Sequence, residues 1–145
     1  MRGRTDRGSA LVEFTWLAIL LMVPLLYVVI AVFEVQRAAF GVSSAARSAA
    51  RAFTQAPSEA HAAAHARAAA RLAFDDQALD EEGSVGIGCR PDPGNCLAPG
   101  SVVTVVVGYD VPLPLLPAAL GEQRPTIRLE AEHSIAYGTY REDRP

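Results

Sequence analysis

The chain has 145 residues, of which 50% are hydrophobic and 20% charged, with a formal net charge of −3. A mean hydropathy of +0.18 is too apolar for a disordered chain, and the apolar residues are not spread evenly as in a small soluble enzyme. A pI near 5.6, with no local basic cluster, argues against a surface that neutralises phosphates, so we predict no nucleic-acid partner.

An uncharged apolar run extends from Phe14 to Phe33, bounded by Glu13 and Glu34. Its twenty residues would rise about 30 Å as a helix, which is the thickness of a bilayer's hydrocarbon core. The alternative is a buried core helix, but the rest of the chain offers too little apolar surface to enclose it. We therefore expect a transmembrane span at 14–33. Pro24 should bend this helix rather than end it, because lipid leaves the backbone no other hydrogen-bonded conformation.

The charges on either side of the run predict its orientation. Arg2, Arg4 and Arg7 precede it, whereas Glu34 and only Arg37 follow closely. This asymmetry predicts a single-pass protein of the cytoplasmic (inner) membrane, with a cytoplasmic N-terminus and an extracytoplasmic C-terminal domain. A cleaved secretory signal peptide is the competing interpretation. Its apolar region is normally shorter, and charged and polar residues here occupy the place of its cleavage site.

The carboxylate of Glu13 stands immediately before the span. It could simply mark the start of the membrane interface. Its spacing also suits another role, because cleavage after Gly8 would create an α-amine on Ser9, a cation at the positive end of a helix. Glu13 lies four residues beyond Ser9 and could neutralise that amine in its own subunit or in a neighbour.

The segment GSALVEF (8–14), followed by an apolar helix, resembles type IV pilin-like proteins. More narrowly it resembles the TadE-like family, minor pilin or pseudopilin components of the Tad/Flp pilus machinery. The alanine- and arginine-containing stretches 35–39 and 45–51 are similar to the segment that follows the membrane helix in that family. The resemblance covers residues 7–53, although Pro24 lies deeper in the helix than the proline that is common in the family.

The resemblance implies a processing site and an assembly site. A prepilin peptidase would cleave between Gly8 and Ser9 and remove the basic leader, residues 1–8. Glu13 and Phe14 would then support assembly with other pilin-like subunits and the Tad inner-membrane platform.

Helical periodicity continues beyond the span. Apolar residues at 42, 45, 46, 49, 50 and 53 lie on one helical face, which predicts a single helix over 9–54. Alanine at most of these positions suits close packing against another helix. Arg47 and Arg51 indicate a solvated face, with docking of acidic partners as the second interpretation. Pro57-Ser58-Glu59 predicts the start of a second helix that continues through Phe74 and completes a helical hairpin.

Two possible ion-binding patterns in this region are incomplete. His61 and His65 are four residues apart, but they lack both the glutamate of HExxH and a third ligand, so we expect exposed histidines. The acidic run within 75–82 lacks the alternating ligands and central glycine of a calcium loop and is interpreted as a solvated helix exit. We predict no metal and no cofactor.

The composition changes at Gly83 from alanine-rich to valine-, glycine- and proline-rich. Strands are expected at 84–88, 101–109 and 126–137, forming a small antiparallel sheet against the helices within an extracytoplasmic domain, 55–145. The fold class is therefore α+β. Recurrent prolines in 111–117 predict an apolar extended segment outside the ladder, which either covers its own sheet or faces the membrane or a partner.

The two cysteines, Cys89 and Cys96, flank the turn-forming residues RPDPGN. Nothing nearby completes a zinc site, whereas the turn-formers and the extracytoplasmic topology favour a disulfide. With inverted topology they would be free thiols.

Two functional interpretations follow. The sequence contains no GxSxG, P-loop, dinucleotide or CxxC motif, and His133 has no evident nucleophile partner, so we do not expect an enzyme. The first interpretation is a processed pilin-like assembly protein. The alternative is an uncut single-pass anchor that presents a small extracytoplasmic binding domain.

Overall fold

The computed structural model describes residues 7–79, 83–113 and 125–144. The elements in chain order are α1 (Arg7–Gln55), α2 (Glu59–Asp75), β1 (Ser84–Arg90), β2 (Val102–Pro112) and β3 (Thr126–Ala136). The expected α+β class is confirmed, with a long apolar N-terminal helix, a second helix and a three-stranded antiparallel sheet.

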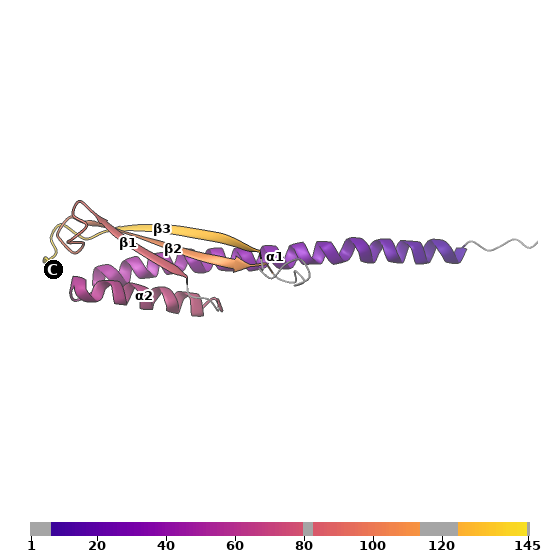
Figure 1. Cartoon of the computed structure of the whole chain (residues 1–145), viewed down its shortest axis with the longest axis horizontal. Coiled ribbons are helices and arrows are strands. Elements are labelled where there is room, and N and C mark those ends of the chain that lie inside the picture. Colours follow the sequence, from indigo (N-terminus) through magenta and orange to yellow (C-terminus); the bar gives the residue numbers. More distant parts are fainter. Residues whose placement is uncertain (1–6, 80–82, 114–124, 145) are drawn as a thin grey trace, which may run out of the picture.

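The helix α1 is a single rod of 49 residues that continues through Pro24 without interruption. Figure 1 shows its N-terminal half projecting alone, while its C-terminal half packs beside α2 and against β2 and β3 of the sheet. The projecting half exposes large apolar side chains, among them Leu11 at 72% and Phe33 at 66%. By length and composition α1 can cross a membrane, and none of its most apolar stretch is buried, which is compatible with a single-pass anchor.

The hairpin of α1 and α2 is closed by a short turn and packed through alanines. The predicted apolar face of α1 is buried, and Ala62, Ala66 and Ala70 of α2 are buried as well. These small side chains allow the two backbones to approach closely. Gly41 of α1 makes room for the segment that follows α2, since a Cβ there would lie 2.7 Å from Leu79 Cδ1.

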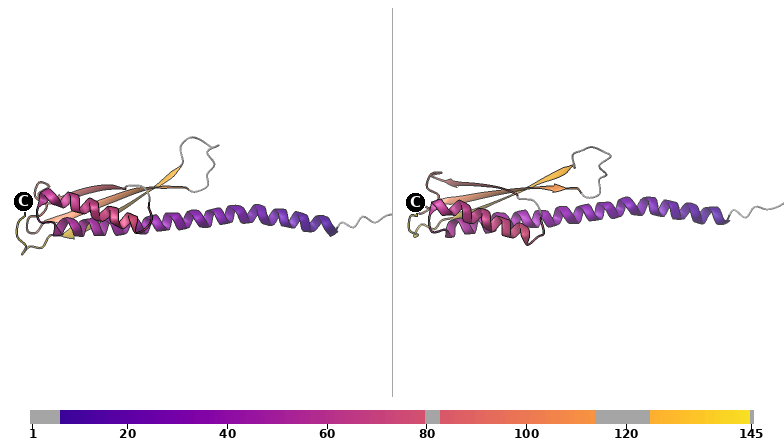
Figure 2. Two further views of the ribbon diagram at one scale, coloured as in Figure 1. Left: turned by 90° about the horizontal axis from the view of Figure 1, so that it is seen from below. Right: turned by 60° about the horizontal axis from the view of Figure 1, so that its bottom comes forward.

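The sheet has the order β1-β2-β3, with antiparallel pairing throughout. The central strand β2 turns Val103, Val105 and Val107 toward the core, and all three are completely buried. The views in Figure 2 show the sheet lying along the C-terminal half of α1, and β2 and β3 separating from α1 toward the Pro112 and Thr126 ends. The sheet and α2 therefore cover different sides of one helix.

Several boundaries differ from the sequence predictions, most of them by one or two residues. The helix α1 begins at Arg7 rather than Ser9, and β1 continues past Gly88 to Arg90. The expectation that Val111 and Pro112 leave the ladder is wrong, because Val111 pairs with Ile127 and Pro112 with Thr126. Proline is tolerated there because it is the last residue of β2, where the missing N–H is not needed. The rest of the proline-rich segment, from residue 114, lies outside the described residues.

Candidate functional site

The predicted processing and assembly residues all lie on the first turns of α1. The backbones of Gly8 and Ser9 are helical, so cleavage between them would fall within the first turn. Glu13 is exposed one turn beyond Ser9, and Phe14 next to it is 71% exposed. The leader residues 1–6 lie outside the described part of the chain. The predicted cleavage point therefore lies at the helical start of α1.

Glu13 is an isolated acid at the edge of the apolar segment. Its carboxylate forms no ion pair or hydrogen bond with any of the residues that the structure describes. The acid at the other end of the segment, Glu34, differs because it pairs with Arg37 one turn later, with 2.5 Å between Oε2 and Nη2. An unpaired carboxylate beside an apolar surface gains from a cationic partner, and within 7–79, 83–113 and 125–144 this copy supplies none.

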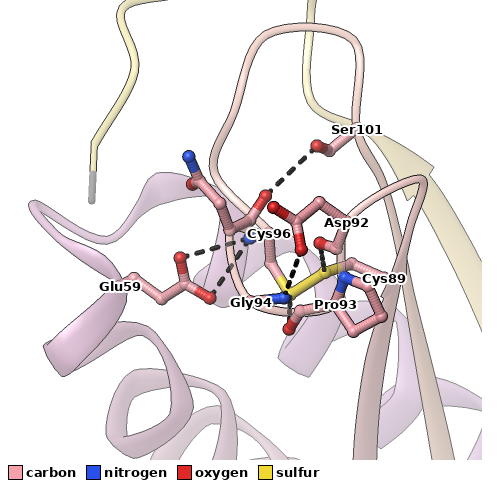
Figure 3. Close-up of a disulfide and its surroundings, with 8 residues drawn as sticks. Glu59, Cys89, Asp92, Pro93, Gly94, Cys96 and Ser101 are labelled. Atoms are coloured by element: carbon pink, nitrogen blue, oxygen red, sulfur yellow. Dashed lines mark hydrogen bonds between the residues drawn. A yellow bond between two sulfur atoms is a disulfide. The ribbon is translucent and has the colours of Figure 1, made fainter.

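The end of the molecule opposite the apolar segment contains the predicted disulfide. We call this end, which includes the loop from Cys89 to Cys96 and the start of α2, the tip. Cys89 and Cys96 are bonded, with their Cα atoms 5.4 Å apart, which confirms that prediction. The carboxylate of Glu59, in the first turn of α2, accepts the backbone N–H of Cys96 at 3.1 and 3.2 Å (Figure 3). The helical hairpin and the disulfide loop are thereby joined directly. A carboxylate at this position also complements the positive end of α2.

Sequence analysis did not identify the residues that close this tip from the C-terminus. The last turn of α1 carries no basic residue, and arginines from the segment after β3 instead donate to one carbonyl group in this turn and to one just beyond it. Arg141 Nη1 donates to the Thr54 carbonyl at 2.7 Å, and Arg144 Nη1 donates to the Ala56 carbonyl at 3.1 Å. Uncapped carbonyls near Gln55 and two arginines after the last strand were the available signals, but only the fold brings them together.

The polar patterns that resembled ion sites remain on the surface. His61 and His65 are exposed, as predicted, and His61 Nδ1 lies 2.9 Å from Ser58 Oγ. Among the described residues, no three His, Cys, Asp or Glu side chains gather closely enough to hold a metal ion.

The described surface includes a cavity and a shallower groove. A cavity of about 140 Å³ lies between α2 and β1, where it is lined by apolar Phe74 and Val85 and by Arg67 and Arg71. A shallower groove of about 370 Å³ runs along α1, lined by Ser44, Arg47, Ser48, Arg51, Ala52 and Gln55. The two arginines predicted to form a solvated face therefore line a groove.

Comparison of the chain with protein-family models, curated proteins and solved structures finds no match.

Proposed function

We propose that this chain is a pilin-like, TadE-like component of a Tad/Flp pilus or related secretion apparatus, with a structural or assembly role. The observation that carries the proposal is the unpaired Glu13 on a continuous helix, one turn after Ser9 and directly before the exposed apolar segment. The proposed location is the inner membrane, with α2 and the sheet on the extracytoplasmic side.

The proposed role of Glu13 follows from its position. Cleavage after Gly8 would leave the amine of Ser9 at the first residue of α1, where the helix dipole disfavours a cation. The Glu13 carboxylate would offset this charge from one turn away, or would accept the amine of a neighbouring subunit as membrane helices associate. Such a pair is worth on the order of 0.5 kcal/mol when exposed, and more when shielded by lipid.

N-terminal analysis of the protein recovered from membranes tests the processing step. The proposal is supported if the chain begins at Ser9 in cells with a prepilin peptidase and if residues 1–8 are retained in cells without one. A chain that begins at Met1 or Arg2 in both supports the alternative, an uncut anchor that displays the disulfide-braced tip to a ligand.

Glu13→Ala tests the assembly step. We expect normal membrane insertion but roughly tenfold lower incorporation into the assembled apparatus, because the amine loses its counter-charge. Tenfold corresponds to about 1.4 kcal/mol, the larger value expected for a pair shielded by lipid. Incorporation is measured by co-purification of the tagged chain with other apparatus subunits. Glu34→Ala is the matched control, since it removes an acid from the other end of the same segment, where Arg37 is its partner. Equal incorporation of both variants would remove the role assigned to Glu13.

A further inference from the structure

One side of α1 beyond the apolar segment is left open by both α2 and the sheet. Ser44, Ser48 and Ala52 recur every four residues along it and are half-buried, while Arg47 and Arg51 stand exposed beside them. These five residues and Gln55 line the groove of about 370 Å³, which we call the α1 groove. Neither arginine forms an ion pair with any described residue. The groove is therefore shallow, lined by small residues along its length, and positively charged.

The opposite side of the molecule is the outer face of the sheet. It carries three acids, Asp110, Glu130 and Glu132, and two arginines, Arg90 at the tip end of β1 and Arg128 on β3. Between Ser84 and Gly88, β1 places only serine and glycine side chains on this face, and a Cβ on Gly88 would meet nothing within 4 Å. On β3 the outer positions include Arg128, Glu130 and Glu132. Arg128 is already engaged by Asp110 at 2.9 Å and Glu130 at 3.1 Å.

Glu132 is the outer-face acid that remains available. It is exposed, pairs in register with the exposed Val106 and forms no ion pair with any residue in the described ranges. Glu132 lies near the middle of this face, four residues along the ladder from the row of Arg90, and its carboxylate complements the two unpaired arginines of the α1 groove.

The two surfaces also lie at similar heights along α1. The tip end of β3 is level with the C-terminal end of α1, because Arg141, shortly after this strand, binds the Thr54 carbonyl. Glu132 lies about 13 Å back along β3 from Ala136, at about 3.3 Å per residue. A distance of about 13 Å along α1 corresponds to about nine residues, so the same distance back from the C-terminal end of α1 lies close to Arg47. Copies anchored by the same membrane segment would thus present Glu132 opposite Arg47.

We propose that the α1 groove of one copy docks on the outer sheet face of a second copy of this chain, with Arg47 and Arg51 paired to Glu132. This inference rests on the proposed function in assembly and names the surfaces that would carry it. Because the two surfaces differ, the contact is heterologous and can repeat from copy to copy. Anionic lipid is a poor alternative for Arg47, which lies about 21 Å of helix beyond Phe33, well over a Debye length away.

Charge exchange in the full-length chain tests the contact. A photo-crosslinking residue at Val106 reports contact between copies in membranes. Arg47→Glu with Arg51→Glu forms one population, and Glu132→Arg forms the other. In each population alone, the yield of crosslinks between copies should fall roughly tenfold, because the docked surfaces then carry charges of the same sign. Co-expression should restore crosslinking, since each altered surface regains an opposite charge on the other population.

Arg67→Glu on α2 is the matched control, since it makes the same charge change on an exposed helical arginine outside the α1 groove, and it should leave crosslinking unchanged. Formation of the Cys89–Cys96 disulfide in every variant reports folding. Unchanged crosslinking in either altered population, or no recovery on co-expression, overturns the proposal. Loss that responds to the arginine changes but not to Glu132→Arg also overturns it and identifies a different acidic partner. Processing at Ser9 and dependence on Glu13, measured in the same samples, separate failure of this contact from failure of the proposed function.

Discussion

At the scale of single residues, Arg141 joins the end of the chain to the end of α1. Its guanidinium donates to the Thr54 carbonyl at 2.7 Å and lies 5.0 Å from the ring centre of the buried Tyr137. The carbonyl groups at the end of a helix need donors, and here the Thr54 carbonyl takes its donor from a residue 87 positions later. The tip therefore depends on long-range hydrogen bonds as well as on apolar packing.

Arg141→Ala should lower the free energy of unfolding of the full chain in detergent by about 1–2 kcal/mol. The loss combines the hydrogen bond to Thr54 with the cation–π contact to Tyr137. Denaturant titration followed by circular dichroism measures it. Arg67→Ala, at an exposed arginine that makes no ion pair with a described residue, should change stability by less than about 0.5 kcal/mol. Equal effects of the two substitutions would contradict a capping role.

The Cys89–Cys96 disulfide acts on the unfolded chain. A disulfide over a sequence separation of 7 lowers the conformational entropy of the unfolded chain. This raises the free energy of the unfolded state by about 2.5 kcal/mol at 25 °C. The double variant Cys89→Ala and Cys96→Ala should lose about this much stability, and a reducing agent should then have no further effect on it. Thermal unfolding in oxidising and reducing buffer measures both. A variant as stable as the oxidised parent would show that the bond contributes little.

At the scale of elements, the α1–α2 hairpin is a contact of small side chains. Ala66 of α2 is completely buried against α1, whereas Ala64, half a turn away, is exposed. Such an interface gains from close backbone approach and has no space for larger side chains.

Ala66→Leu should therefore destabilise the chain by about 1–3 kcal/mol, because added methylene groups force the helices apart. Ala64→Leu is the matched control, with the same chemical change on the exposed side of α2, and should be nearly neutral. Urea midpoints of the two variants in one detergent compare them directly. If Ala64→Leu proved the more damaging, the assigned packing face of α2 would be wrong.

Element boundaries show where local sequence rules were insufficient. Proline content predicted that the ladder ends before Val111, yet β2 continues to Pro112 because β3 supplies partners for both residues. Periodicity predicted the end of α1 to within one residue, at 54 against Gln55, because the turn to α2 follows immediately. Strand ends depend on a partner strand, whereas helix ends depend mainly on nearby residues.

At the scale of the whole molecule, the apolar N-terminal half of α1 is exposed, whereas the C-terminal half packs against α2 and the sheet. Trp16, the single tryptophan of the chain, is 69% exposed near the beginning of the apolar segment. It therefore reports on the surroundings of this segment alone.

In lipid vesicles, Trp16 emission should shift to shorter wavelength. Bromine placed near the headgroup end of the acyl chains should quench it more than bromine at the bilayer centre, because tryptophan near a span's end lies at the interface. Fluorescence of the reconstituted full chain measures both effects. Emission typical of water, or the strongest quenching from the bilayer centre, would contradict the predicted span of 14–33.

The sequence alone determined the features that depend on local composition and spacing. These are the helical rod with its apolar half, the alanine face, the positions of three strands and the short loop between Cys89 and Cys96. Each follows from periodicity, β-branched content or turn-forming residues within a few positions. The cleavage and assembly roles of Gly8, Ser9, Glu13 and Phe14 stay predictions, because they concern events between molecules.

Only the tertiary structure decided which distant groups meet. It placed Arg141 and Arg144 on the carbonyls that end α1, joined Glu59 to Cys96, and left Arg47 and Arg51 on the opposite side of the molecule from Glu132. No local pattern encodes these relations. They arise because the sheet and α2 cover two sides of α1 and leave a third side open.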